Sequence, residues 1–178
     1  MFIKVLIAYL VLLLGSQPLI AVADELEQPL DDAITLESDA GFYDEKQGLS
    51  IYTGQVVIKQ GNMTLEADKV TVFSKDRDIY KLIATGKPVK FTQTPEEGKE
   101  DVHGHSLVME YKTKIRVLIM TQQAQVWQGE NSTASERIVY DRISEIIKAG
   151  DESLVNQRVH VILRSSQDTS VENNELGL

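Results

Sequence analysis

Residues 54–72 read Gly-Gln-Val-Val-Ile-Lys-Gln-Gly-Asn-Met-Thr-Leu-Glu-Ala-Asp-Lys-Val-Thr-Val, which is the pattern of a β-hairpin. Apolar residues recur in both arms, at Val56, Ile58, Leu65, Val70 and Val72. The many β-branched residues favour a pleated, half-buried surface. Gln60-Gly61-Asn62 is typical of a turn between the arms. The stretch therefore predicts two paired strands joined at Gly61.

The hairpin pattern recurs farther along the chain, at a shift of 68 residues (121 − 53 = 68). Identical pairs at this shift include Thr53 and Thr121, Gln60 and Gln128, and Gly61 and Gly129. Apolar positions also coincide, because Ile58 meets Val126 and Val70 meets Ile138. We interpret this as a repeat of structural units and not as a catalytic motif.

Further short apolar segments predict more strands. We expect separate strands at 79–84 and 89–91, divided by Thr85-Gly86-Lys87-Pro88, and others around 107–111, 117–119 and 159–163. Residues 142–149 are compatible with a strand or with one or two helical turns. The sequence has no long segment of helical periodicity after its N-terminus, so an all-β sandwich, jelly roll or solenoid is expected.

The two ends of the chain differ from its middle. Lys4, the apolar run 5–14 and the small residues Ala21-Val22-Ala23 predict a cleaved signal peptide over 1–23, with a retained anchor helix as the alternative. Residues 24–33 predict a flexible acidic arm, and residues 165–178 a disordered polar tail. The domain between them is expected at 34–164.

Composition excludes several classes of function. The formal charge of −9 argues against nucleic acid as a partner. The sequence has no cysteine, which excludes disulfides, thiolate metal sites and a lipid-modified N-terminal cysteine. A basic window over 59–90 is either a solvated strand face or a contact for anionic head groups; its residues are Lys59, Lys69, Lys75, Arg77, Lys81, Lys87 and Lys90.

The candidate catalytic and metal-binding residues are few. His103 and His105 would share a strand face, but a metal site needs three or four ligands, and His160 stands apart. The serines lie in no nucleophile elbow, and no glycine-rich phosphate loop is present. We therefore expect no enzymatic activity, no metal and no cofactor.

One set of apolar residues shares an inward-facing parity through the predicted strands. Such a stripe is ordinarily core, and the alternative is that the sheets part enough to hold an apolar guest. The residues are Ile34, Leu36, Val56, Ile58, Val70, Val72, Phe91, Met109, Tyr111, Val126 and Ile138.

Several of these segments together resemble the OstA-like family. The resemblance covers about residues 34–167 and rests on the order and spacing of its motifs. The motifs are Ile-Thr-Leu-Glu-Ser-Asp (34–39), Thr-Gly-Gln-Val-Val-Ile-Lys-Gln-Gly (53–61), Leu-Glu-Ala-Asp-Lys-Val-Thr-Val (65–72), Gly-Lys-Pro-Val-Lys-Phe (86–91), Val-His-Gly-His-Ser-Leu-Val-Met-Glu-Tyr (102–111) and Arg-Val-His-Val-Ile-Leu-Arg-Ser-Ser-Gln (158–167).

The resemblance implies a twisted, open antiparallel β-jelly roll, a folded-over sheet with open ends. It implies a periplasmic lipopolysaccharide carrier whose inward stripe contacts lipid A acyl chains, and it makes the Gly61 turn one of the hinges that fold the sheet. It also implies head-to-tail self-assembly, with an inner-membrane transport complex and an outer-membrane β-barrel translocon as partners. The alternatives are an envelope interaction module that binds no lipid, an inner-membrane-anchored sibling, and a glycan hydrolase.

Overall fold

The computed structural model describes residues 33–94, 99–151 and 158–164, which form one antiparallel sheet of ten strands. The expected signal peptide, nearly all of the acidic arm and the polar tail lie outside these residues. Within the described residues there is no helix, and hence none that could cross a membrane. The strands are β1 (Thr35–Glu37), β2 (Ala40–Asp44), β3 (Leu49–Gln60), β4 (Met63–Lys75), β5 (Asp78–Gln93), β6 (Val102–Lys112), β7 (Val117–Gln128), β8 (Asn131–Asp141), β9 (Ile146–Ala149) and β10 (His160–Ile162).

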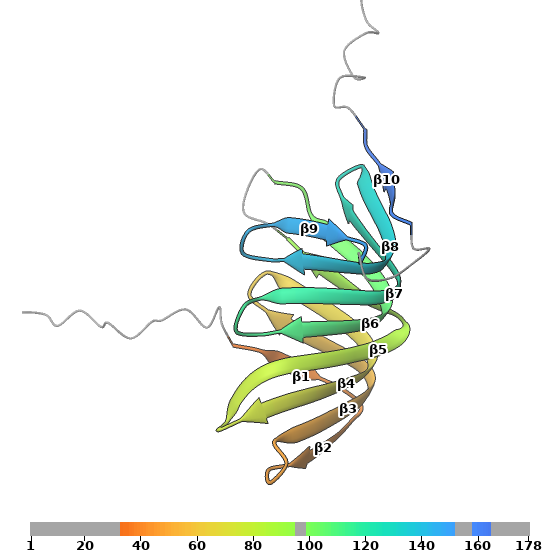
Figure 1. The fold of residues 1–178 in the computed structure, drawn as a ribbon. Coiled ribbons are helices and arrows are strands. Elements are labelled where there is room, and N and C mark those ends of the chain that lie inside the picture. Colours follow the sequence, from red (N-terminus) through yellow and green to blue (C-terminus); the bar gives the residue numbers. More distant parts are fainter. Residues whose placement is uncertain (1–32, 95–98, 152–157, 165–178) are drawn as a thin grey trace, which may run out of the picture. The chain divides into compact units, whose positions relative to one another are not determined.

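The long strands β3 to β8 pair in chain order, and their pairing shifts register near the middle of each strand (Figure 1). The shifts lie between Thr53 and Val56 in β3 and between Thr121 and Ala124 in β7. Bulges of this kind bend a strand and increase its twist. Aligned across six strands, they form a line, here called the crease, along which the sheet folds over.

The crease divides the sheet into two facing halves. The β2 half-sheet contains β2, residues 49–53, 69–75, 78–85, 108–112, 117–121 and 137–141, and β9. The β1 half-sheet contains β1, residues 56–60, 63–67, 89–93, 102–106, 124–128 and 131–135, and β10. The expected folded-over antiparallel jelly roll is therefore confirmed.

Unusual backbone conformations explain why the chain bends at the crease. Gly54 and Gln55 have φ of 80° and 44°, and their counterparts Gln122 and Gln123 have 65° and 58°. At Gly54 a side chain would also collide with the Asp39 carboxylate, so both the backbone conformation and this close approach favour glycine there. The 68-residue repeat is confirmed in this sense, because both units carry the same bulge at the same offset.

Three expectations about local structure are resolved by this arrangement. The Gly61 turn joins β3 to β4 but is not a hinge, because the sheet folds at the mid-strand bulges and not at its hairpin turns. Two separate strands at 79–84 and 89–91 were the wrong expectation, since β5 continues through the bulge between them. Residues 142–145 form a turn that leads into strand β9, so the helical alternative is wrong.

Candidate functional site

The eleven residues of the inward stripe all lie between the two half-sheets. Nine of them are at most 6% exposed, while Ile34 and Leu36 are partly buried at the β1 edge. Cross-strand register explains the alignment, because Leu36, Ile58, Leu65 and Phe91 follow one another in a single row across β1, β3, β4 and β5. An apolar surface therefore runs through the interior from the β1 edge to β8.

Side chains from both halves fill this interior. The Phe91 ring, from the β1 half-sheet, lies 5.9 Å from the Tyr140 ring of the β2 half-sheet. Gly104 leaves room for Phe91, because a Cβ atom there would lie 2.7 Å from Phe91 Cε1. In the structure the interior is thus a packed core and not an open trough.

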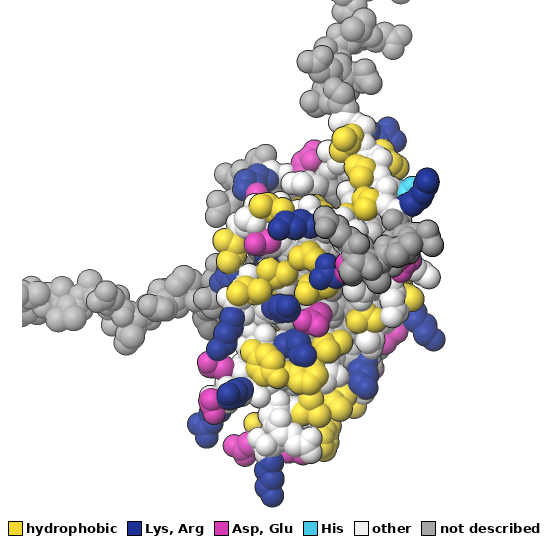
Figure 2. Space-filling model, viewed as in Figure 1, with side chains coloured by type: hydrophobic (Ala, Val, Ile, Leu, Met, Phe, Trp, Pro, Cys, Tyr) yellow, Lys and Arg dark blue, Asp and Glu magenta, His cyan; other side chains and the backbone are white. Residues whose placement is uncertain are grey.

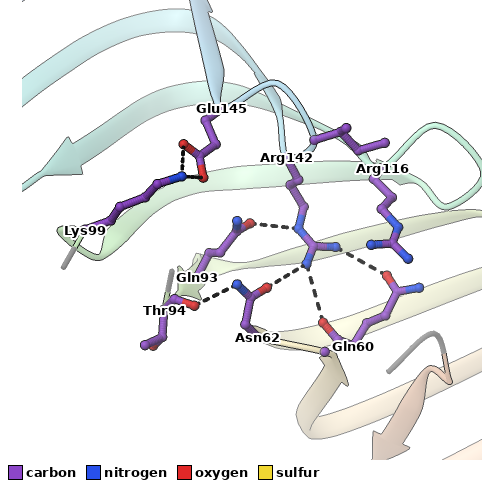
Figure 3. Close-up of a pocket in the computed structure, with 10 residues that line it drawn as sticks. Gln60, Asn62, Gln93, Thr94, Lys99, Arg116, Arg142 and Glu145 are labelled. Atoms are coloured by element: carbon purple, nitrogen blue, oxygen red, sulfur yellow. Dashed lines mark hydrogen bonds and ion pairs between the residues drawn. The ribbon is translucent and has the colours of Figure 1, made fainter. Parts of the chain in front are cut away.

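The margin opposite the crease, here called the mouth, is closed by polar contacts (Figure 3). Arg142, in the β8–β9 turn of the β2 half-sheet, reaches across to the β1 half-sheet. Its Nε donates to Gln93 Oε1 at 2.9 Å, and its Nη1 donates to Gln60 Oε1 at 3.3 Å. Its Nη2 donates to Gln60 O at 3.4 Å and to Asn62 Oδ1 at 3.3 Å. One buried guanidinium therefore links the two halves.

Tyr111 connects this cluster to the apolar interior. Its hydroxyl donates to Gln60 Oε1 at 2.5 Å and accepts from Arg142 Nη1 at 2.7 Å, while its ring lies among the inward stripe. Burial raises the pKa of Tyr111 above its ordinary value, and the nearby Arg142 charge opposes that rise. The hydroxyl is therefore neutral at physiological pH and can act as both donor and acceptor.

A second link crosses the mouth at its exposed side. Lys99 Nζ lies 2.9 Å from Glu145 Oε1, which joins the segment before β6 to the β8–β9 turn. Figure 3 shows this pair beside the Arg142 cluster, with the Arg116 side chain extending toward Gln60. Because the Lys99–Glu145 pair is exposed, it adds little to stability by itself.

Two pockets open at the mouth. The first has a volume of about 460 Å³ and is polar; its described lining residues are Gln60, Gly61, Asn62, Gln93, Thr94, Lys99, Arg116, Arg142, Ile143 and Glu145. The second, of about 530 Å³, shares Gln60 and Arg116 with it; its other described lining residues are Ile34, Arg77, Asp78, Ile79, Thr113 and Lys114. We call the first the mouth pocket.

The histidines form an aromatic cluster on the outer face of the β1 half-sheet. His103 stacks on Trp127 with ring centroids 5.3 Å apart, and the His105 ring lies 5.2 Å from Trp127 at a tilt of 46°. His160 is exposed on β10. No three potential ligands gather into a metal site in the part of the chain that the structure describes.

The basic window lies on outer surfaces. All of its residues are exposed except Lys81, which is partly buried with its Nζ 4.4 Å from the Phe73 ring centroid. Lys59 and Lys90 belong to the β1 half-sheet, whereas Lys69 and Lys81 belong to the β2 half-sheet. On the side of the molecule that Figure 2 draws, Lys and Arg are interleaved with acidic and apolar side chains, as on a solvated surface.

The two edges of the sheet expose backbone groups and apolar side chains. At the N-terminal edge, β1 and β2 each pair only with β3, and Phe42 and Tyr43 of β2 are 58% and 60% exposed. At the C-terminal edge, β9 and β10 each pair only with β8, and Ile162 is 57% exposed. Among the described strands, no further strand covers either edge. Such edges are able to add a strand from another chain.

The inward stripe predicted from the sequence did not include Gln60, Gln93 or Arg142, the polar residues that close the mouth. Gln60 continues the parity of Val56 and Ile58, and Gln93 continues that of Phe91, so the alternation itself pointed both glutamines inward. Arg142 gave no such signal, because it lies in a turn after β8. Its contacts with Gln60 span 82 residues of sequence.

Comparisons with known proteins agree with this architecture. A family profile described as LptA/(LptD N-terminal domain) LPS transport protein matches residues 35–146. The lipopolysaccharide export system protein LptH of Pseudomonas aeruginosa is 34% identical over 138 residues, which are 77% of this chain and 77% of that protein. LptA of Escherichia coli K12 is 31% identical over 131 residues, or 72% and 68% of the two chains.

A solved structure is similar as well. The crystal structure of LptH, described as the LptA-homologous periplasmic component of the lipopolysaccharide transport device of Pseudomonas aeruginosa, superposes with a TM-score of 0.70. Its sequence identity is 28%, and the match covers 77% of this chain and 100% of that chain.

Proposed function

The chain belongs to the LptA/LptD N-terminal domain family of lipopolysaccharide transport proteins, and on this basis we propose that it carries lipopolysaccharide through the periplasm. It is a transport protein and not an enzyme. The periplasmic location is supported by the pattern of an export signal over 1–23 and by the description of the LptH structure.

The apolar interior is the observation that carries the proposal. Burying one methylene contributes about 0.8 kcal/mol, so exposing an acyl chain of roughly a dozen methylenes to water costs on the order of 10 kcal/mol. A lipid with several chains therefore needs a continuous apolar cover to cross an aqueous compartment. The inward stripe, from Leu36 at one edge to Ile138 in β8, offers such a surface without any reactive group.

Lipid entry requires the two half-sheets to separate at the mouth. The ladder hydrogen bonds of each half run within that half, and the halves share backbone only at the crease. Opening would therefore exchange side-chain contacts such as Phe91–Tyr140 for contacts with acyl chains, while the strands stay paired. The contacts to be broken at the mouth include those of Arg142, the Tyr111–Gln60 hydrogen bond and the Lys99–Glu145 pair.

Assembly into a bridge is the second part of the proposal. The uncovered strands β1 and β2 at one edge and β9 and β10 at the other are different surfaces. A contact between unlike edges is heterologous and extends head to tail. Such a stack would continue the apolar interior from one copy to the next, and to related domains of inner- and outer-membrane transport partners.

Site-specific photocrosslinking in cells tests lipid binding. A photoreactive residue at the inward position Phe91 is expected to crosslink to lipopolysaccharide. The adjacent position Thr92 is exposed on the outer face of the same strand and serves as the matched control. Crosslinks at Thr92 without any at Phe91 would contradict the proposal.

The packed interior favours one alternative, an envelope interaction module that pairs through its edges and binds no lipid. Purified protein would then assemble as its concentration rises, without saturable lipopolysaccharide binding. Measuring mass against concentration together with lipid binding separates the two functions.

A further inference from the structure

Arg142 is a buried cation at the mouth whose hydrogen-bond acceptors are all neutral. Arg142 is 9% exposed. Among the described residues, its guanidinium donates to the amide oxygens of Gln60, Asn62 and Gln93, to the backbone carbonyl of Gln60 and to the Tyr111 hydroxyl, but to no carboxylate. Buried charges in proteins are ordinarily paired with a charge of opposite sign. An anion is therefore the partner that this site would accept most readily.

Cations outnumber carboxylates among the described lining residues of the mouth pocket. Its described lining residues include three cations, Lys99, Arg116 and Arg142, and one carboxylate, Glu145, which pairs with Lys99. The chain as a whole carries a formal charge of −9, so this concentration of positive charge stands out against an acidic protein. The pocket volume of about 460 Å³ is ample for a phosphate group on a sugar.

We propose that the mouth pocket binds a phosphate monoester, with the Arg142 guanidinium as its central contact. The inference rests on the proposed function, since the phosphate we assign to it belongs to the head group of the lipid whose chains enter the interior. A planar guanidinium matches two phosphate oxygens at once and binds them by charge-assisted hydrogen bonds.

The position of the pocket fits one amphiphile bound at two places. Tyr111 hydrogen-bonds to Arg142 through its hydroxyl, and its ring belongs to the inward stripe. A phosphate on Arg142 would therefore lie directly beside the apolar interior. It would also replace Gln60 Oε1 and Gln93 Oε1 as acceptors, which removes two of the hydrogen bonds that link the two half-sheets at this margin. Head-group binding and opening of the mouth are thus coupled through one side chain.

The test compares two lipids that differ only in phosphate. Purified full-length mature protein is titrated with phosphorylated lipid A, with the same lipid after enzymatic removal of its phosphates, and with inorganic phosphate alone. The variants are Arg142→Gln, which removes the charge and keeps hydrogen-bonding ability, and Arg142→Lys. The control is Arg137→Gln, which removes a partly exposed cation on β8 whose partner is Asp151. Thermal unfolding verifies that each variant is folded.

We expect wild type and Arg137→Gln to bind the phosphorylated lipid about tenfold more tightly than the dephosphorylated one. This is the difference in affinity that one charge-assisted hydrogen bond would contribute. Arg142→Gln should bind both lipids alike, at the wild-type affinity for the dephosphorylated lipid. Arg142→Lys should retain part of the preference, because it keeps the charge without the planar fork.

The outcomes distinguish this inference from the function on which it rests. Wild type without a preference for phosphate, or Arg142→Gln with the full preference, overturns the inference and leaves lipid carriage standing. Protein that binds neither lipid overturns both. If inorganic phosphate binds as tightly as the phosphorylated lipid, and only when Arg142 is present, the phosphate site is supported but its assignment to a head group is overturned.

Discussion

Two buried tyrosines provide a sharp test of the packing at the mouth. Tyr111 and Tyr140 are both 1% exposed and lie in the same interior, but their hydroxyl groups differ. The Tyr111 hydroxyl bonds to Gln60 and Arg142. The Tyr140 hydroxyl is buried without a hydrogen-bond partner among the described residues. Replacing each by phenylalanine removes a single oxygen atom in each case.

The two substitutions should change the free energy of unfolding differently: Tyr111→Phe should lower it, and Tyr140→Phe should leave it unchanged or raise it. Tyr111→Phe loses the hydrogen bond to Gln60, which is neutral, and the one from Arg142, which is charged. Bonds of these two kinds contribute about 1 kcal/mol and about 1.5–3 kcal/mol to stability, respectively. Gln60 Oε1 and Arg142 Nη1 keep each other as partners, so neither is left unpaired, and we expect a net loss of about 2 kcal/mol. Tyr140→Phe removes an unsatisfied polar group, and we expect no loss and a gain of up to about 1 kcal/mol.

Equilibrium unfolding in urea measures both changes. The midpoint should fall for Tyr111→Phe and stay or rise for Tyr140→Phe, with the slope of the transition unchanged in both variants. The measurement belongs at neutral pH, where burial, which raises the pKa of both tyrosines, keeps them neutral. Equal destabilisation by the two substitutions would refute the assignment of the Tyr111–Gln60 hydrogen bond as a link across the mouth.

Three further predictions concern the interior and one turn. Gly104→Ala should destabilise the fold by about 1–3 kcal/mol, because the new methyl group collides with the Phe91 ring. Ile58→Ala, at a fully buried position, should cost about 2–5 kcal/mol in urea unfolding. Asp141 has its pKa lowered chiefly by a hydrogen bond from the Ser144 amide, so it stabilises the fold above the unfolded-state pKa of about 3.9. That stabilisation is lost as pH falls through the lowered folded-state pKa, and Asp141→Asn should show a smaller acid-side decline.

Each of these has a result that would contradict it. Unchanged stability of Gly104→Ala would mean that Phe91 does not approach the β6 backbone as described. A cost below about 1 kcal/mol for Ile58→Ala would show that the interior is loosely packed. For Asp141→Asn, an acid-side decline equal to that of wild type would exclude the turn hydrogen bonds as a source of pH dependence.

The sequence by itself determined the strands and which of their residues face inward. Alternation and turn residues are local, so they placed the hairpin of residues 54–72 and the inward stripe. The structure places the residues of that stripe between its half-sheets. The hairpin also contained a feature that simple alternation could not explain. Leu65 and Val70 both point inward although they differ in parity. A bulge between them brings both side chains to the same face of the sheet. A bulge can be identified only from the pairing of the strands.

The tertiary structure alone decided where the sheet folds and what closes it. The crease exists because bulges in six strands line up, and each bulge depends on register with a neighbouring strand. Arg142 meets Gln60 and Gln93 only after the sheet has folded, across 82 and 49 residues of sequence. Local patterns carry no information about contacts of that range, because they arise from the summed geometry of the strands between them. The polar mouth is therefore formed only by the fold, whereas the apolar interior behind it could be predicted from the alternation of residues in the strands.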